Sequence, residues 1–264
     1  MYINKVNEYL SQTDLPPVPK WILDEYEYLV KYSYERQHGG KSERPMGKLY
    51  MSQCGDCPRK LAYQLHKCPK NGKTITTRDR SNFHIGDVLE AKMICNGLLV
   101  FGKERLKYVG KNQKTTTIEV NGEIITGHPD GQLDDYLLEC KTMNPYAHDR
   151  LVRTSEVDYG YLTQVNMYME AEKLNKCILV AFNKGNSMEH EITIDKQQQI
   201  VDDVYKNLET VLKSTPDNLP DRRYTFDKKG LLPWNCTYCS YYKTCWEDKI
   251  ERVLVGKSYK LKRK

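Results

Sequence analysis

Five stretches of the chain are predicted to be helical: residues 20–36, 57–66, 82–99, 155–174 and 195–213. In the first and third of these, apolar residues recur at the three- and four-residue spacing of one helix face. Pro58 stands at the first position of the second helix, where its missing N–H costs no hydrogen bond. Ser81 precedes the third helix, in a position where a serine can cap the first turn, and Ser155 opens the fourth.

Strands are predicted between and after these helices. The stretches TTTIEV and EIITGH are joined by Asn121-Gly122, the strongest short signal for a β-hairpin. A third strand over 135–142 is expected to close this meander, and KCILVAFN and MEHEITI form a second hairpin around 184–186. Residues 39–45 and 214–235 are expected to be loops. This order of elements predicts a single α/β core, with helices flanking a mixed central sheet.

Composition and charge narrow the kind of protein. The 264 residues are 29% charged and 39% hydrophobic, as in a water-soluble globular domain, and the net charge of +6 favours a polyanionic partner. There is no apolar run long enough for a membrane span and no apolar core of a signal peptide. We therefore expect a cytoplasmic, reducing location, in which the nine cysteines are thiols and bind metal or lie buried singly.

Candidate chemistry first appears in LLECKTMN, residues 137–144. On a strand, Glu139 and Lys141 point to the same face and Cys140 points to the other. Asp130, between a proline and a glycine, is expected at a strand end from which it can converge with Glu139 and Lys141. Oxygen ligands of this kind suit Mg²⁺ or Mn²⁺, and a nearby lysine can orient a nucleophile or neutralise developing charge. A simple ion pair is the alternative interpretation.

Pro129-Asp130 followed by Glu139-Cys140-Lys141 resembles the signature of the PD-(D/E)xK nucleases. Two further motifs resemble those of the RecB-type group: Gly86-Asp87-Val88-Leu89-Glu90 before the meander, and Tyr161, Gln164 and Tyr168 on the helix after the third strand. The resemblance implies a restriction-endonuclease-like core and a metal held by Glu90, Asp130, Glu139 and the backbone carbonyl of Cys140. It also implies that Lys141 positions the water and that Gln164 and Tyr168 support the site and the DNA strand.

Other residues compete for these roles. His84 is a rival for the ligand role of Glu90, although it stands before the glycine. Asp134 and Asp135 are interpreted as turn residues that would replace Asp130 only if the strand register were different. His128 is interpreted as a strand residue without a catalytic role, close enough to touch DNA.

The cysteines have a spacing typical of metal sites. Cys236, Cys239 and Cys245 form a C-x₂-C-x₅-C pattern, and a tetrahedral site needs a fourth ligand. Cys57-Pro58-Arg59-Lys60 resembles the N-terminal cysteine motif of the iron–sulfur nucleases, the group that includes Cas-four and the AddB subunit. The resemblance implies a structural [4Fe–4S] cluster on these four cysteines that joins the N- and C-terminal segments. Zn²⁺ is the alternative metal, and Cys54 is the alternative to Cys57.

The resulting hypothesis is a metal-dependent DNA exonuclease that acts on single-stranded ends. Its domain would span 46–250, between an N-terminal helical segment (1–45) and a basic C-terminal tail (251–264). The candidate DNA contacts are Arg59, Lys60, Tyr161 and Tyr238. The chain has no GxxxxGK[ST] motif, so unwinding would require a partner. A helicase and a CRISPR or recombination protein are the candidate partners. An endonuclease or end-processing subunit, and a non-catalytic zinc-containing DNA-binding protein, are the alternative hypotheses.

Overall fold

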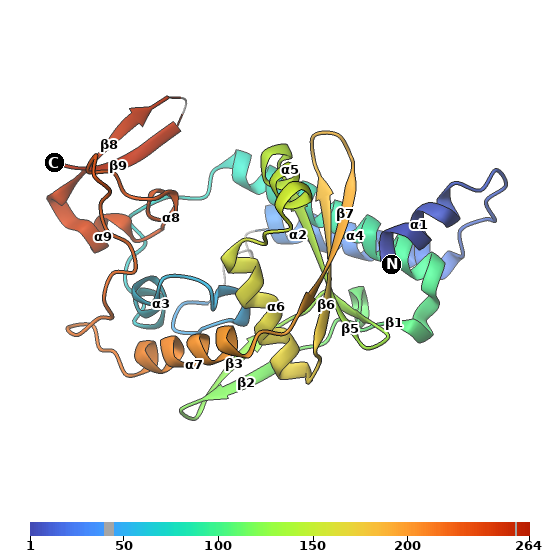
Figure 1. Cartoon of the computed structure of the whole chain (residues 1–264), viewed down its shortest axis with the longest axis horizontal. Coiled ribbons are helices and arrows are strands. Elements are labelled where there is room, and N and C mark those ends of the chain that lie inside the picture. The colour runs from blue at the N-terminus through green and yellow to red at the C-terminus, as the bar shows by residue number, and fades with distance from the viewer. Residues whose placement is uncertain (40–44, 257) are drawn as a thin grey trace.

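A five-stranded mixed sheet forms the centre of the molecule in this computed structural model, which describes residues 1–39, 45–256 and 258–264 (Figure 1). In order across the sheet, the strands are β1 (Leu106–Lys107), β4 (Gly131–Leu133), β5 (Tyr136–Met143), β6 (Lys176–Asn183) and β7 (Glu189–Asp195). Only β5 and β6 run parallel, and β5 is the middle strand. Most of the loop predicted for residues 39–45 lies outside the described residues.

Helices cover both faces of this sheet. Their bounds are α1 (Tyr2–Leu10), α2 (Lys20–His38), α3 (Pro58–Leu65), α4 (Thr77–Arg105), α5 (Pro145–Thr154), α6 (Tyr159–Glu172), α7 (Gln198–Leu212), α8 (Trp234–Thr237) and α9 (Tyr242–Trp246), with short 3₁₀ turns η1 (Met51–Gln53), η2 (Gly110–Asn112) and η3 (Glu247–Lys249). Leu137 of β5 joins the core under α6 and α7, whereas Leu138 joins the core under α1 and α4. The alternation of a strand thus divides β5 between two cores. None of the described helices has the length and apolar character needed to cross a bilayer.

The predicted hairpin around Asn121-Gly122 is confirmed, but it stands apart from the central sheet. β2 (Thr116–Val120) and β3 (Glu123–Gly127) pair in a two-stranded sheet of their own, and positive φ angles of 50° and 81° at the two turn residues suit a primed turn. The prediction that strand 135–142 closes this meander is wrong. β5 pairs instead with the short β4, because the chain leaves β3 through His128-Pro129 and the buried face of the hairpin packs under α6 and α7.

Two predicted helix starts are also wrong. The third helix begins earlier, because Thr76 and Asp79 form a reciprocal capping box, and Ser81 lies inside the first turns of α4. Ser155 does not open the fourth helix but ends α5, in a left-handed conformation with φ of 54°. α6 is capped instead by Asp158, whose side chain accepts a hydrogen bond from the Gly160 N–H.

The end of the described chain forms a separate unit, here called the C-terminal module: α8, α9, η3, β8 (Ile250–Val255) and β9 (Ser258–Arg263). β8 and β9 pair as an antiparallel hairpin, so the residues predicted as a basic tail are largely strand. Figure 1 shows this module beside α3 and away from the central sheet. Its small core includes Leu232, Trp246, Ile250 and Leu261. The 67–73 loop is attached to it, since the Gly72 N–H donates to the Ser240 carbonyl over 2.7 Å.

Candidate active site

Strand β5 carries the central pair of the site. Glu139 is fully buried, and Lys141 forms an ion pair with its Oε1 atom. Cys140, between them, packs in the opposite core with Leu138. The predicted orientation of these three side chains is therefore confirmed. A charged pair in the middle strand of a sheet is costly to bury, so the surrounding groups must satisfy it.

Asp130 joins this pair from the neighbouring strand. It lies immediately before β4, where Gly131 pairs with Leu138 of β5. Its side chain is 8% exposed, and its Oδ2 accepts a hydrogen bond from the Cys140 N–H over 2.8 Å. The backbone of β5 thus holds Asp130 next to the strand segment that carries Glu139 and Lys141.

Helix α6 contributes one face to the site. Gln164 Nε2 donates to Glu139 Oε1 over 2.8 Å and lies 3.4 Å from the hydroxyl of the buried Tyr168. The Lys141 Nζ lies 5.2 Å from the centre of the Tyr161 ring, in cation–π contact. The three residues predicted to share a helix face therefore all approach Glu139 or Lys141.

Glu90 approaches from α4. This helix lies close to β5 at Gly86, where a Cβ atom would come within 3.1 Å of Thr142 Oγ1. One turn after Gly86, Glu90 is half-buried. Burial, followed by the negative charges of Asp130 and Glu139, raises the pKa of Glu90 well above its usual value, and Lys141 opposes this rise. Glu90 therefore belongs to the same electrostatic cluster as the β-sheet residues.

Like Glu90, the other two carboxyl groups of the site, Glu139 and Asp130, have a raised pKa. Burial and then the charge of Asp130 raise the pKa of Glu139 to about 7, and burial also raises the pKa of Asp130. For Lys141, burial favours the neutral amine, but Glu139 and Asp130 outweigh it and raise the pKa of the ammonium. Lys141 therefore stays charged, and the acids compete for its single positive charge.

A divalent cation would relieve this excess of buried acid. Within the described residues, no group of three or more His, Cys, Asp or Glu side chains is arranged tightly enough to hold a metal ion. One observation nevertheless suits a cation: the Glu139 Oε2 atom is buried and has no hydrogen-bond partner among those residues. Buried polar atoms normally have a partner, and a carboxylate oxygen beside two other acids is a suitable ligand for Mg²⁺ or Mn²⁺.

The rival residues lie elsewhere. The His84 Nδ1 lies 3.0 Å from the Ser33 hydroxyl, at the contact between α2 and α4. Asp134 is in the turn between β4 and β5 and pairs with Arg105, and Asp135 is in the same turn, as predicted. His128 is exposed. None of these four is among the main causes of the raised pKa of Glu90, Asp130 or Glu139.

The cysteines gather at a second place, between α3 and the C-terminal module. Burial, and after it the charges of Cys239, Cys245 and Cys57, raise the pKa of Cys236 to about 12. Cys57 likewise acts on Cys239 and Cys245, so the four predicted ligands are mutual neighbours. They too are not arranged tightly enough to hold an ion, and none of the nine cysteines forms a disulfide.

Cys54 does not belong to this group. It is buried in the core under α6 and α7, and its Sγ lies 3.8 Å from the Tyr50 carbonyl oxygen. Of the two candidates for the early cysteine, Cys57 is thus the one placed beside the other three. Cys95 lies in the core under α1 and α4, Cys140 and Cys177 lie in the central sheet, and Cys68 lies in the loop after α3.

The residues predicted to contact DNA differ in whether their side chains are already engaged by the protein. Arg59 donates to the Tyr63 hydroxyl and the Pro220 carbonyl, and Lys60 pairs with Asp56, so both are already engaged. Tyr238 is 59% exposed and lies edge-on to Trp234, with ring centres 6.4 Å apart. Contact of these residues with DNA stays a prediction.

Two supporting side chains escaped sequence reasoning. Arg222 donates two hydrogen bonds to the Cys245 carbonyl, over 2.6 and 3.1 Å. It lies in a loop with no regular pattern of apolar residues, so nothing in the sequence indicated this role. Asp87 accepts hydrogen bonds from Ser33, Arg36 and Gln37, and thereby ties α4 to α2 one turn before Glu90. The sequence shows only that Asp87 is an acidic residue on the α4 face that also bears Glu90. That position alone does not indicate which residues would donate hydrogen bonds to it.

No protein-family model matches this chain, and no curated protein matches it. Distant similarity exists among solved structures. SSO0001 is 16% identical over 81% of this chain and 93% of its own, with a TM-score of 0.47. LHK-Exo in complex with dAMP is 14% identical over 70% and 90%, with a TM-score of 0.45. The alkaline exonuclease LHK-Exo from Laribacter hongkongensis is 16% identical over 64% and 87%, with a TM-score of 0.36. Similarity this weak assigns neither a family nor an activity to the chain.

Proposed function

We propose that this protein is a DNA nuclease of the PD-(D/E)xK type that works with Mg²⁺ or Mn²⁺. The observation that carries the proposal is the meeting of Glu90, Asp130 and Glu139, from three separate segments, beside the ammonium of Lys141. The unpartnered Oε2 of Glu139 supports the same interpretation. A structural ion pair would need only one acid for one lysine, whereas this site has three.

Each side chain of the site would have a separate role in hydrolysis. Glu90, Asp130, Glu139 and the Cys140 carbonyl would hold the cation, which polarises a phosphodiester and favours ionisation of water when bound. Water attacks phosphorus and gives up a proton, while the bond from phosphorus to the leaving sugar oxygen breaks and that oxygen takes up a proton. Lys141 can orient that water and neutralise charge developing on the phosphate. Gln164 holds Glu139 in place through the 2.8 Å hydrogen bond, and Tyr168 buttresses Gln164.

Cleavage assays with labelled DNA test this proposal. Purified protein should degrade DNA only when Mg²⁺ or Mn²⁺ is added, and Asp130→Ala and Lys141→Ala should each abolish degradation without unfolding the protein. Thr193→Ala on β7, on the far edge of the sheet, is a matched control and should cut normally. Binding without cutting in Mn²⁺ would favour the non-catalytic alternative, and full activity in both site variants would refute the proposal.

We further propose exonuclease action on single-stranded ends. This refinement rests on the resemblance of the sequence motifs to those of the RecB-type group. Linear and circular single strands of equal sequence separate it from the endonuclease alternative. An exonuclease degrades only the linear strand, whereas loss of the circle would contradict this part of the proposal and leave the nuclease assignment intact.

We also propose that Cys57, Cys236, Cys239 and Cys245 bind a structural [4Fe–4S] cluster. Their common location supports a shared metal, and their protonated thiols would release protons on binding it. Protein purified without air should be brown and contain iron and sulfide. A colourless protein with one zinc ion would replace the cluster with the alternative metal, and absence of both would refute the site.

A further inference from the structure

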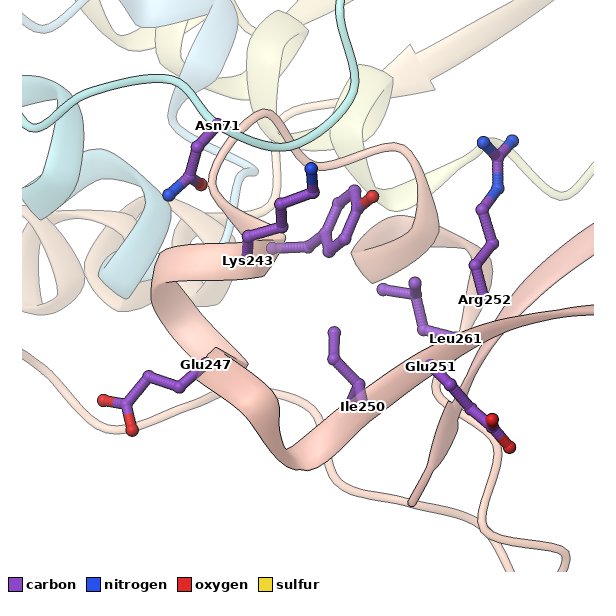
Figure 2. Close-up of a pocket in the computed structure, with 8 residues that line it drawn as sticks. Asn71, Lys243, Glu247, Ile250, Glu251, Arg252 and Leu261 are labelled. Atoms are coloured by element: carbon purple, nitrogen blue, oxygen red, sulfur yellow. The ribbon is translucent and has the colours of Figure 1, made fainter.

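A hollow of about 350 Å³ opens in the C-terminal module, on a part of the surface that no candidate site residue lines (Figure 2). Its walls come from α9, η3, both strands of the β8–β9 hairpin, and Asn71 of the loop before α4. This volume lies within the range of small-molecule pockets. Neither the carboxylate site nor the cysteine group explains it.

The floor of the hollow is apolar. Ile250 and Leu261 are 8% and 1% exposed and belong to the core of the module. Tyr242 packs against the same core and also lines the hollow, so an aromatic ring is available there. An apolar floor with one aromatic side chain suits a flat, partly apolar group such as a nucleobase.

The rim carries two cations. Lys243 and Arg252 are exposed, and neither forms an ion pair with a described carboxylate; the Arg252 guanidinium lies 4.2 Å from the centre of the Tyr259 ring. Figure 2 shows the two cationic side chains on either side of the hollow, both extending away from Ile250 and Leu261. The side chains of Glu247 and Glu251 extend outward in other directions. The positive end of the pocket is therefore open to an anion.

The loop side of the pocket is fixed. Asn71 Nδ2 donates to Thr244 Oγ1 over 2.6 Å, and its Oδ1 accepts from the Thr244 N–H over 3.2 Å. Lysines at 67, 70 and 73 lie in this same loop, and basic residues also dominate β9. The surroundings thus favour a polyanion over an acidic or neutral partner.

We propose that this hollow binds one nucleotide unit of a DNA strand, with the base against Tyr242 and the apolar floor and the phosphate between Lys243 and Arg252. The choice of DNA as the strand rests on the proposed function. The pocket would act as an anchor remote from the site of cleavage. It would strengthen binding of long strands, while strands too short to reach it would be cut as before.

Fluorescence anisotropy with labelled oligothymidylate tests the anchor. The whole 264-residue chain, as purified, is used without added Mg²⁺ or Mn²⁺, so that affinity is measured apart from cleavage. Lys243→Ala, Arg252→Ala and Tyr242→Leu should each weaken binding of a long strand by about 10-fold, because each removes one phosphate or base contact. Tyr242→Phe keeps the ring and should bind normally. Melting temperature and bound metal are measured for every variant, since Lys243 is close in sequence to Cys245.

Lys262→Ala is the matched control, because Lys262 is an exposed cation of the same hairpin that does not line the hollow. If Lys262→Ala and Arg252→Ala lose the same amount of affinity for the strand, the effect comes from overall positive charge and the proposal is overturned. Unchanged binding in the three pocket variants would also overturn it. If thymidine monophosphate binds in a Lys243-dependent manner but the strand does not, the pocket serves free nucleotides and the strand anchor is wrong. Pocket-dependent binding by a protein that never cuts DNA would keep the anchor and refute the nuclease.

Discussion

Glu139 makes both of its contacts through a single oxygen. Lys141 and Gln164 share Oε1, and Oε2 is buried without a described partner. The two contacts are sufficient to fix the orientation of the carboxylate, so that the second oxygen is directed in advance of any ligand. Preorganisation of this kind is what a catalytic ligand needs, because no reorganisation remains for the moment of reaction.

Glu139→Gln tests this arrangement at the level of one atom. The amide preserves the size of the side chain but removes the charge that opposes Lys141, so we expect cleavage to fall by at least about 100-fold. Gln164→Ala should have a smaller effect, since it loosens Glu139 without removing it. Rates on labelled DNA and Mn²⁺ titration of both variants measure the difference. A Gln164→Ala rate as low as that of Glu139→Gln would contradict a merely supporting role.

The raised pKa of Glu139 predicts a dependence of metal binding on pH. Its carboxyl group titrates near 7 in the folded protein instead of near 4.5, so a cation must displace a proton at lower pH. The contribution of Glu139 to the affinity for Mn²⁺ should therefore rise with pH and level off above about pH 7, as calorimetric titration can measure. In Glu139→Gln this part of the dependence should disappear.

The raised pKa of Glu139 affects folding stability in the opposite direction to metal affinity. Between 4.5 and about 7 the folded metal-free protein keeps a proton that the unfolded chain has released, so its free energy of unfolding falls as pH rises through this range. Chemical denaturation in the absence of divalent ions measures this fall, and Glu139→Gln should flatten it. A wild-type protein that gains stability over the same range would contradict the shift.

Residue-level chemistry was the most predictable part of the site. The alternation of a strand sufficed to place Glu139 and Lys141 together, and offsets of three and four placed Tyr161, Gln164 and Tyr168 on one face of α6. The donors to Asp87 could not be predicted, because they come from α2, at a distance in sequence that no local pattern spans.

At the level of elements, the approach of α4 to β5 positions Glu90. Gly86→Ala should push the helix away, because the new Cβ would lie only 3.1 Å from Thr142 Oγ1. We expect weaker Mn²⁺ binding and slower cleavage with little change in melting temperature. Thr142→Ala removes the obstructing oxygen, so the double variant should recover metal affinity. If the double variant does not recover metal affinity, the distance between α4 and β5 at Gly86 does not determine how Glu90 contributes to metal binding.

Element boundaries were less predictable than element types. Helix α5 was missed altogether, although Asn144-Pro145 is a good start signal: Asn144 accepts from the Ala147 N–H, and Pro145 occupies the first turn. The β8–β9 hairpin was missed because charge dominates its sequence. Only a few of its residues, such as Ile250 and Leu261, face a core, and that core exists only once α8 and α9 are in place.

At the level of the whole molecule, the proposed cluster on the four cysteines would join α3 to the C-terminal module across a long separation in sequence. Cys57→Ala should therefore lower the free energy of unfolding by well over the roughly 1 kcal/mol of an average substitution. Cys68→Ala, at a thiol outside the group, is the control. Denaturation of anaerobically purified proteins, with their metal content, measures both. Equal losses would show that Cys57 is not a metal ligand.

Topology was beyond sequence reasoning at this scale. The order of strands across the sheet places β4 beside β5 and leaves β2 and β3 outside, and both choices depend on which faces can be buried under α6 and α7. Adjacent strands along the chain usually pair, so the simple meander was the expected arrangement.

The hydrogen bond from the Cys140 amide to Asp130 has a consequence for how this chain can diverge. Since a main-chain group makes the bond, every residue except proline can supply it at position 140. Descendants of this gene are therefore free to exchange the sulfur for other small apolar side chains. An insertion or deletion of a single residue in the turn at 134–135, by contrast, would break the bond while leaving Glu90, Asp130 and Glu139 in the alignment.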